Sequence, residues 1–412
     1  MAFESSDNTT SPFSKQWSFR STSSSSTSKN SITDHHNLFS TQEIISYFSL
    51  HQPYYTSIAT LKTQNHHHIT CMTVHNNILY AASGNQISTF DLITLSPIPS
   101  FNGQDLSSGG FIKSMEFYND DKLLTAHQDS KIRVWKRHRF VTTLPTMKDK
   151  LCRSIFGNNY VQVRRHKRKL WIEHNDAVSG LRVNNGVIYT VSWDKTLKIW
   201  RGSDFKCLES ITAHADAVNA VEVSRNGTVY TGSADGTIKV WERRNDTVWK
   251  HSMVSILEKH RSTVNTLALS EDGRVLLSGG CDGVIIAWER DDNDRMVEIG
   301  EVVGGHDGAV LCMIGLDGHD FFVSGGADRT VRIWGRAGGN GGSGCRGLFC
   351  CMGVLVGHDK PVRSVTVTAE CGVLNDVVLV CSGSLDGEIK VWRIVVSELI
   401  KYNQHTFNYL AH

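Results

Sequence analysis

The chain has 412 residues, of which 40% are apolar, so it is long enough to bury a sizeable core. Its 43 Lys and Arg residues nearly balance 41 Asp and Glu residues, and a net charge of +2 argues against a protein built mainly to bind nucleic acid or anionic membrane. We expect no membrane insertion, because no run of about 18 apolar residues occurs, and ten cysteines without a secretory signal indicate reduced thiols in the cytoplasm or nucleus.

Residues 1–53 are predicted to form a disordered tail. Up to about residue 40 the chain is rich in Ser, Thr and Asn, as in Ser21–Ser28, and it lacks apolar periodicity. A purely solvated tail and a phosphorylated regulatory tail both fit this composition. The segment Gln42–Leu50 fits either a short helix or a docking element.

A repeat occupies residues 54–395. Each copy reads as short strands of period two separated by turns, so each strand has one buried face. A lone sheet cannot bury both of its faces, whereas a ring of sheets buries every face and leaves few exposed edges. Six copies close on Trp, at Trp135, Trp200, Trp241, Trp288, Trp334 and Trp392, and a weaker seventh copy closes on Phe90.

This repeat resembles the WD40 family, whose units of about 40–45 residues each form a four-stranded blade. The resemblance implies an all-β, seven-bladed β-propeller. After Trp392 no further repeat follows, and we expect residues 396–412 to be a C-terminal tail. The N-terminal segment Ser57–Thr63 has the register of Phe205–Thr212, an outer strand, so we predict that it completes the last blade and closes the ring.

Five copies contain a His, a Ser or Thr, an Asp and a Trp, which could be mistaken for catalytic triads. Near-identical sets suit a ring of similar blades, whereas an enzyme needs one set. The resemblance implies that Asp anchors His, His contacts the hydroxyl and the hydroxyl contacts the indole, a network that stabilises when every member is satisfied. We therefore predict no catalytic site, cofactor or metal. The five tetrads are His174, Thr190, Asp194, Trp200; His214, Thr231, Asp235, Trp241; His260, Ser278, Asp282, Trp288; His306, Ser324, Asp328, Trp334; and His358, Ser382, Asp386, Trp392.

Two blades beside the predicted seam depart from this pattern. The first has Asn85 and Phe90 in place of Asp and Trp, and its His is one of the run 66–68. The second has Asp129 and Trp135 but no His before its first strand. We expect these blades to be less stable than the others. Neither the His run nor Cys345, Cys350 and Cys351 has the spacing of a zinc site.

A basic insertion separates Trp135 from Trp200. It contains Lys136–Phe140 and Arg164–Lys169. A solvated loop, a nuclear-import signal, and a nucleic-acid or phospholipid patch all remain open for it. The candidate nuclear-import residues are Arg164, Arg165, Lys167, Arg168 and Lys169.

Partners of a propeller bind its turn-lined faces. In WD40 proteins the residue before the turn Asp often points onto the narrower face, and here Trp193 holds that position in one blade. An exposed Trp suits a binding hot spot, although packing on a neighbouring blade fits equally well. The candidate protein-binding residues are Trp193, Asp176, Asp216, Asn219, Asn265, Lys360 and Arg363.

Several segments, including Asn159–Leu181 with the basic insertion, resemble a plant group of WD-repeat proteins typified by Jingubang, a regulator of pollen germination and pollen-tube growth. This resemblance implies a monomeric regulatory scaffold working within complexes, with a transcription factor as one class of partner. The alternative is a substrate receptor of a cullin-RING ubiquitin ligase, whose adaptor would bind a W-D-x-R box. Trp241–Arg244 matches that box with Glu in place of Asp.

Overall fold

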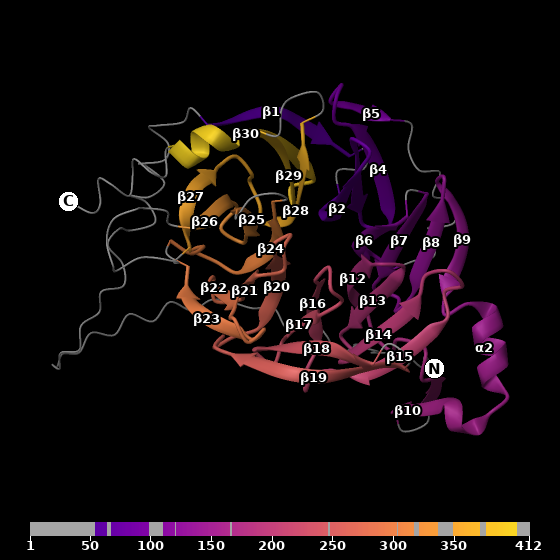
Figure 1. Cartoon of the computed structure of the whole chain (residues 1–412). Helices are drawn as coiled ribbons and strands as arrows, with labels where there is room; N and C mark the ends of the chain where they lie inside the picture. The colour runs from indigo at the N-terminus through magenta and orange to yellow at the C-terminus, as the bar shows by residue number, and fades with distance from the viewer. Residues whose placement is uncertain are drawn as a thin grey trace, which may run out of the picture. The chain divides into compact units, whose positions relative to one another are not determined.

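Seven four-stranded antiparallel sheets stand around a central axis in the computed structural model of the chain (Figure 1). The structure describes residues 54–63, 67–98, 110–119, 121–164, 167–245, 248–302, 304–316, 321–336, 349–370 and 376–401. The predicted all-β, seven-bladed propeller is confirmed. The N-terminal tail, including Gln42–Leu50, lies outside the described residues.

Each blade runs from an inner strand at the axis to an outer strand at the rim. The first three blades are β2 (Ile69–His75), β3 (Ile78–Ser83), β4 (Gln86–Asp91), β5 (Ser96–Ile98); β6 (Ile112–Tyr118), β7 (Lys122–His127), β8 (Ile132–Lys136), β9 (Arg139–Leu144); and β12 (Val178–Asn184), β13 (Val187–Ser192), β14 (Thr196–Arg201), β15 (Cys207–Thr212). The next three are β16 (Val218–Val223), β17 (Val229–Ser233), β18 (Thr237–Asn245), β19 (Val248–Glu258); β20 (Val264–Leu269), β21 (Val275–Gly280), β22 (Ile285–Arg290), β23 (Met296–Glu301); and β24 (Val310–Gly315), β25 (Phe321–Gly326), β26 (Val331–Arg336), β27 (Phe349–Leu355). The last is β28 (Val362–Ala369), β29 (Val377–Ser384), β30 (Glu388–Val395) and β1 (Tyr55–Lys62).

The core lies between the blades. Seven clusters of buried apolar side chains each join two consecutive blades, so the ring is continuous. The second strands are covered on both faces, and β13, β21 and β25 are buried along their whole length. The blades approach so closely that a Cβ on Gly232 would stand 2.7 Å from a methyl of Val264, and one on Gly383 would stand 2.5 Å from Ile69 across the seam. Glycine at these positions therefore sets the spacing between blades.

The N-terminal strand closes the ring, as predicted. β1 pairs antiparallel with β30, with Leu61 opposite Ile389. The hydroxyl groups of Tyr54 and Tyr55 donate to the carbonyls of Met352 and Val354 at 2.9 Å. Tyr54 and Tyr55 thus tie the last blade to its neighbour.

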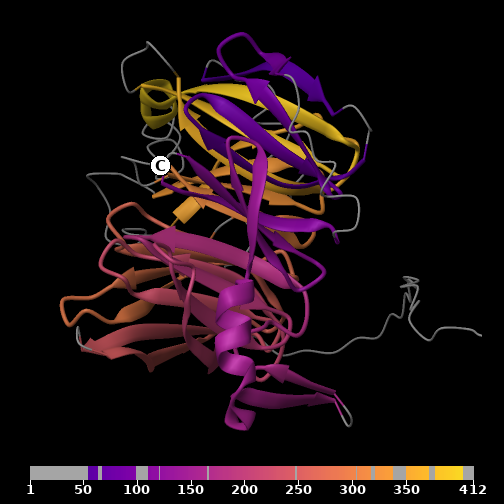
Figure 2. The same ribbon diagram turned by 90° about the vertical axis from the view of Figure 1, so that its right-hand side faces the viewer.

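Two segments add helices to the ring. Helix α2 (Met147–Ser154), the 3-10 helix η2 (Gly157–Asn159) and a hairpin of β10 (Tyr160–Arg164) and β11 (Lys167–Leu170) form the basic insertion, which extends beyond the blades (Figure 2). Residues 396–401 are helical with Leu399 buried, so the packed chain continues past the predicted boundary at residue 395. No helix in the described ranges is long and apolar enough to span a membrane.

Candidate functional site

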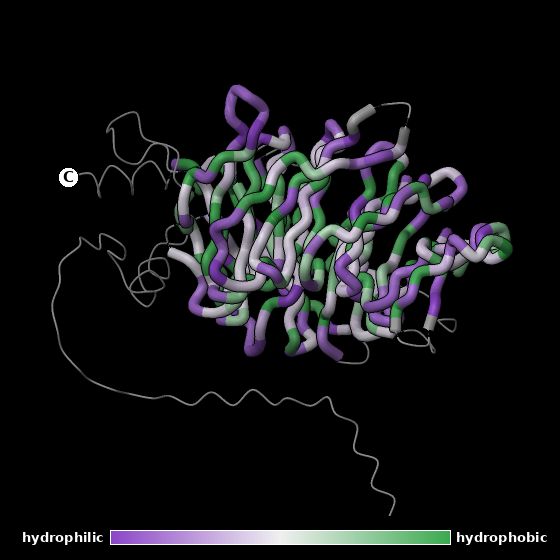
Figure 3. The backbone as a smooth tube through the Cα atoms, turned by 90° about the horizontal axis from the view of Figure 1, so that it is seen from below, coloured by the Kyte–Doolittle hydropathy of each residue, from purple (hydrophilic) through white to green (hydrophobic). Residues whose placement is uncertain are grey.

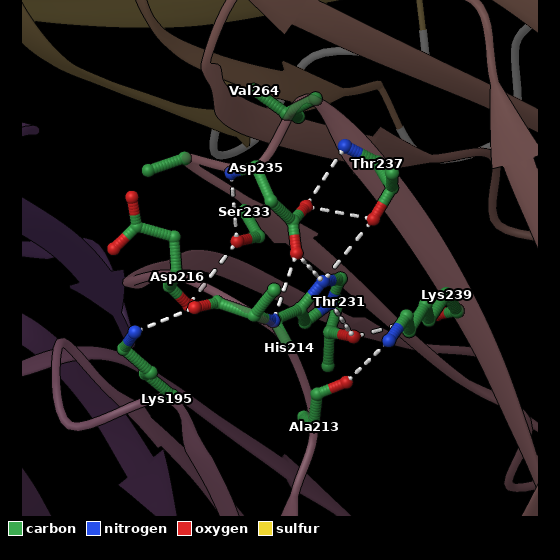
Figure 4. A network of polar contacts seen from close by, with 12 residues as sticks. Lys195, Ala213, His214, Asp216, Thr231, Ser233, Asp235, Thr237, Lys239 and Val264 are labelled. Atoms are coloured by element: carbon green, nitrogen blue, oxygen red, sulfur yellow. Dashed lines mark hydrogen bonds and ion pairs between the residues drawn. The ribbon is translucent and has the colours of Figure 1, made fainter.

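The blade of β16–β19 shows how a predicted tetrad is built, and Figure 4 labels three of its members, His214, Thr231 and Asp235. The Trp241 indole N–H donates to Thr231 Oγ1 at 2.9 Å, and Thr231 Oγ1 lies 2.8 Å from His214 Nε2. His214 Nδ1 lies 3.0 Å from Asp235 Oδ2. Asp235 also accepts from the backbone N–H of Thr237 at 3.0 Å, so the carboxylate holds both the turn and the imidazole.

The electrostatics of this set favour a neutral imidazole beside a carboxylate. Burial lowers the pKa of His214 below its ordinary value, against the pull of Asp235. Burial opposes the ionisation of Asp235, but hydrogen bonds from Thr237 and the contact with His214 outweigh it and lower the Asp235 pKa to about 2. The chain of donors then runs from indole to hydroxyl, hydroxyl to Nε2, and Nδ1–H to carboxylate, which satisfies every member.

Three further predicted tetrads have the same bonds. Their imidazole–hydroxyl distances are 2.7–2.8 Å and their indole–hydroxyl distances are 2.7–2.9 Å. Their imidazole–carboxylate distances are 2.9–3.3 Å. These sets are His174, Thr190, Asp194, Trp200; His306, Ser324, Asp328, Trp334; and His358, Ser382, Asp386, Trp392.

The fifth predicted tetrad is incomplete, which corrects the sequence-based expectation. His260 Nε2 contacts Ser278 at 2.8 Å and Trp288 donates to the same hydroxyl at 2.9 Å, but His260 Nδ1 is buried without a hydrogen-bond partner among the described residues. Asp282 is exposed and, within the described part of the chain, accepts only from the backbone N–H of Val284. Val284 stands where three other blades carry a Thr whose hydroxyl donates to the Asp. The last blade has Glu388 at this position and still holds Asp386 3.0 Å from His358, so the missing hydroxyl does not by itself explain the open carboxylate.

The second blade contains an imidazole that sequence reasoning missed. His127, on the same strand as Thr125, places Nε2 2.8 Å from the Thr125 hydroxyl, which accepts from Trp135 at 2.9 Å. His127 Nδ1 lies 2.9 Å from the carbonyl of Gly110, and Asp129 pairs with Arg133 at 2.6 Å instead. The Thr-x-His spacing of Thr125 and His127 was the sequence signal that could have identified this imidazole. In the first blade, Ala81 occupies the position that the Ser or Thr hydroxyl holds in the other blades, and it pairs with Ser88. This blade therefore has no such network.

These hydroxyls are poorly suited to act as nucleophiles. All six are fully buried, and each accepts an indole N–H. Among the described residues, no three His, Cys, Asp or Glu side chains gather in the manner of a metal site. Cys350 and Cys351 lie on the outer strand β27, where burial raises the pKa of their thiols to about 12 and about 11. Cys345 and His66 lie outside the described residues.

One rim of the ring carries the turn residues. The backbone N–H of Trp193 donates to the carbonyl of Ala177, just before β12, at 3.0 Å, and five other blades repeat this bond. We call this rim the turn face: the turns between second and third strands with the residues that precede each first strand. Trp193 is 38% exposed on it, and Phe111 is 55% exposed. Trp193 is therefore accessible to a partner.

A cationic group lies beside Trp193. Lys113 Nζ stands over the indole ring at 5.2 Å from its centroid. Burial, and then the charge of Arg363 on β28, lower the pKa of Lys113. Neither cation has an ion-pair partner among the described residues. Lys113 follows the first residue of its strand, the position of Asn219, Asn265 and Arg363, so the pattern could have identified it.

The other predicted face residues divide into two groups. Asp176 and Asp216 are exposed, and each accepts from the backbone N–H of the next residue, at 2.7 and 2.8 Å. Asn219 and Asn265 donate to the carbonyls of Val264 and Val310 in the following blades, at 3.0 and 3.1 Å, so they join inner strands. Lys360 is exposed like Arg363.

The inner strands carry one ion-pair cluster. Arg182 contacts Glu222 at 2.6 Å and Glu116 at 3.6 Å, which links three consecutive blades. Burial raises the pKa of Glu116 to about 7, against the charge of Arg182, and Glu222 adds to the rise.

The basic run and the candidate ligase box are only partly described. In the hairpin, Arg164 lies opposite Lys167, Arg168 is exposed and Lys169 donates to the carbonyl of His174 at 3.2 Å; Arg165 lies outside the described residues. In the ligase box Trp241 is buried, Arg243 stacks on Trp249 at 4.5 Å, and the Arg244 side chain is not described.

Six segments of the chain match the family described as WD domain, G-beta repeat: residues 95–136, 166–201, 205–242, 251–289, 298–335 and 349–393. The chain is 24% identical to Myosin heavy chain kinase C of Dictyostelium discoideum over 40% of its length and 18% of that protein. It is 34% identical to F-box/WD repeat-containing protein A of the same organism over 26% and 8%, and 25% identical to Protein ROOT INITIATION DEFECTIVE 3 of Arabidopsis thaliana over 43% and 39%. The matches thus span less than half of each relative.

Proposed function

Because the chain belongs to the WD40 family, whose propellers typically are non-enzymatic interaction scaffolds, we propose that it binds partner proteins on its turn face around Trp193. The observation that carries this proposal is an exposed indole beneath the cation of Lys113, which has no ion-pair partner in the described part of the chain. Trp and Arg are the residue types most enriched in binding hot spots.

Quantitative affinity purification from the native tissue tests this proposal. Trp193→Ala should remove partners that wild-type protein retains. Val254→Ala, 51% exposed on the outer strand β19, is the matched control and should retain them. A Trp193→Ala protein that keeps its melting temperature and all of its partners would overturn the proposal.

The narrower assignment is a Jingubang-like plant regulator of pollen germination and pollen-tube growth, with a transcription factor among its partners. It is supported by the segment Asn159–Leu181, which contains the basic insertion. Pollen that lacks the protein should germinate at an altered rate, and unchanged germination and tube growth would contradict this assignment. We further propose nuclear import through the basic run. A fluorescent fusion of the full chain should lose nuclear signal when Arg165 and Arg168 become Ala.

The ligase-receptor alternative depends on Arg244. If it holds, the protein should bind the ligase's adaptor propeller, and Arg244→Ala should abolish that binding while Arg274→Ala leaves it unchanged. Absence of binding by the wild-type chain would remove this alternative.

A further inference from the structure

The insertion between the second and third blades contains a helix that is attached to the ring by its polar side. We call residues 146–170 the arm. Asp149 is buried, pairs with Arg153 at 2.9 Å and accepts from the backbone N–H of Cys207 at 3.4 Å. Arg153 donates to the carbonyl of Cys207 at 3.1 Å, and Lys150 pairs with Glu173 at 2.6 Å. The polar face of α2 therefore anchors the arm to the third blade.

The apolar side of the same helix faces solvent. Met147, Leu151 and Ile155 follow one another at four-residue spacing and are 71%, 63% and 78% exposed, and Phe156 beside them is 63% exposed. None of the four belongs to a core cluster of the described residues. A helix on a globular surface normally buries its apolar stripe, so this orientation is reversed. Figure 3 shows hydrophobic segments at the outermost edge of this projection.

The arm is also the most basic part of the chain. It has eight Lys and Arg residues and one acidic residue, a net of +7, while the rest of the chain has 35 and 40, a net of −5. The single acid, Asp149, is neutralised by Arg153. Lys148 and Arg168 are exposed and have no ion-pair partner among the described residues. Although the whole chain is nearly neutral, the arm is therefore strongly cationic, and it carries exposed apolar side chains.

We propose that the arm docks on the surface of an anionic lipid membrane. A bilayer interface offers an apolar layer for Met147, Leu151, Ile155 and Phe156. Its negative headgroups suit the exposed cations of the arm, such as Lys148 and Arg168. A second copy would place two net +7 arms together, which charge repulsion opposes. A partner protein would need an apolar groove with an acidic rim, whereas the arm itself is a convex projection.

Vesicle sedimentation with the full chain tests the proposal. The protein should bind vesicles of phosphatidylcholine and phosphatidylserine (about 7:3) and not phosphatidylcholine alone, with binding that weakens as salt rises. Leu151→Ser with Ile155→Ser should weaken binding about tenfold or more. Lys148→Gln and Arg168→Gln should each weaken it about fivefold at low ionic strength.

Two control variants separate docking by the arm from general adhesion. Ile93→Ser removes an apolar side chain that is 65% exposed on the first blade, and Arg274→Gln removes an exposed cation from the fifth. Both should bind vesicles like the wild type, and all variants should keep its melting temperature, because the changed side chains lie outside the core. Failure of the wild type to bind anionic vesicles, or equal losses in control and arm variants, would overturn the proposal. Arm variants that lose a protein partner while wild-type protein ignores vesicles would point to a partner's groove instead. The turn-face proposal is tested by Trp193→Ala and is unaffected by these results.

Discussion

Replacing Asp235 by Ala should destabilise the ring far more than the same change at Asp282, although both occupy the same place in the repeat. Asp235 accepts hydrogen bonds from four groups: His214 Nδ1, the backbone N–H of Ala215, and the backbone N–H and hydroxyl of Thr237. In the described ranges Asp282 accepts from the backbone N–H of Val284 alone. The two substitutions therefore delete the same side chain from different networks.

The magnitudes follow from these contacts. Without Asp235 the buried Nδ1–H of His214 loses its acceptor, a loss of about 1–3 kcal/mol, while water replaces part of the turn bonds because the carboxylate is half-buried. The Thr237 hydroxyl, 3.3 Å from Nδ1, can accept in its place and moderates the loss. We expect about 2–4 kcal/mol for Asp235→Ala and about 0.5 kcal/mol or less for Asp282→Ala. With an unfolding entropy of about 0.7 kcal/mol/K for a ring of this size, the melting temperature should fall by about 3–6 °C and by less than about 1 °C.

Differential scanning calorimetry of the two variants beside the wild type is the appropriate assay, with circular dichroism to confirm retained strand content. Equal shifts for the two variants would refute the reasoning, because they would show that the position in the repeat, rather than the hydrogen bonds made there, determines stability.

Three further outcomes are expected. Burial lowers the pKa of His127 to about 4 from 6.5, so the stabilising effect of the neutral imidazole is complete above pH 6.5 and is lost as the pH falls toward 4. In denaturant titrations, the free energy of unfolding should therefore fall less between pH 7.5 and pH 5 for His127→Leu than for the wild type. An equal fall in both proteins would contradict this assignment. Deleting residues 54–63 together with the tail should leave the last blade open, and retained cooperative unfolding at the wild-type temperature would contradict closure by β1. Arg182→Met leaves Glu116 facing Glu222, so its destabilisation, about 1–2 kcal/mol, should be larger at pH 8 than at pH 5 in paired melting curves, and a loss independent of pH would argue against the ion pair.

Much of the ring could be predicted because a repeat is a local pattern. The His, hydroxyl, Asp and Trp positions recur at fixed spacing, so four tetrads and the closing strand follow from counting residues. The pattern was misleading where one neighbour changes the outcome. Asp282 has the position of the turn Asp but is exposed and does not reach His260, and the second blade obtains its imidazole from His127 on another strand. Hydrogen-bond geometry depends on side chains beyond the motif, which explains both errors.

The sequence by itself determined the number of blades, the way the ring closes and the residues that brace most turns, since these depend on short-range periodicity and on burial of alternate side chains. Only the tertiary structure decided which surfaces remain open. Lys113 and Trp193 lie far apart along the chain and meet because the second and third blades are neighbours in the ring. The apolar stripe of α2 reads in sequence like an ordinary buried face, and it is exposed because Asp149 and Arg153 bind the third blade with the opposite side. Which side of an amphipathic helix is covered depends on the partner that the fold supplies, and that information is not local to the helix.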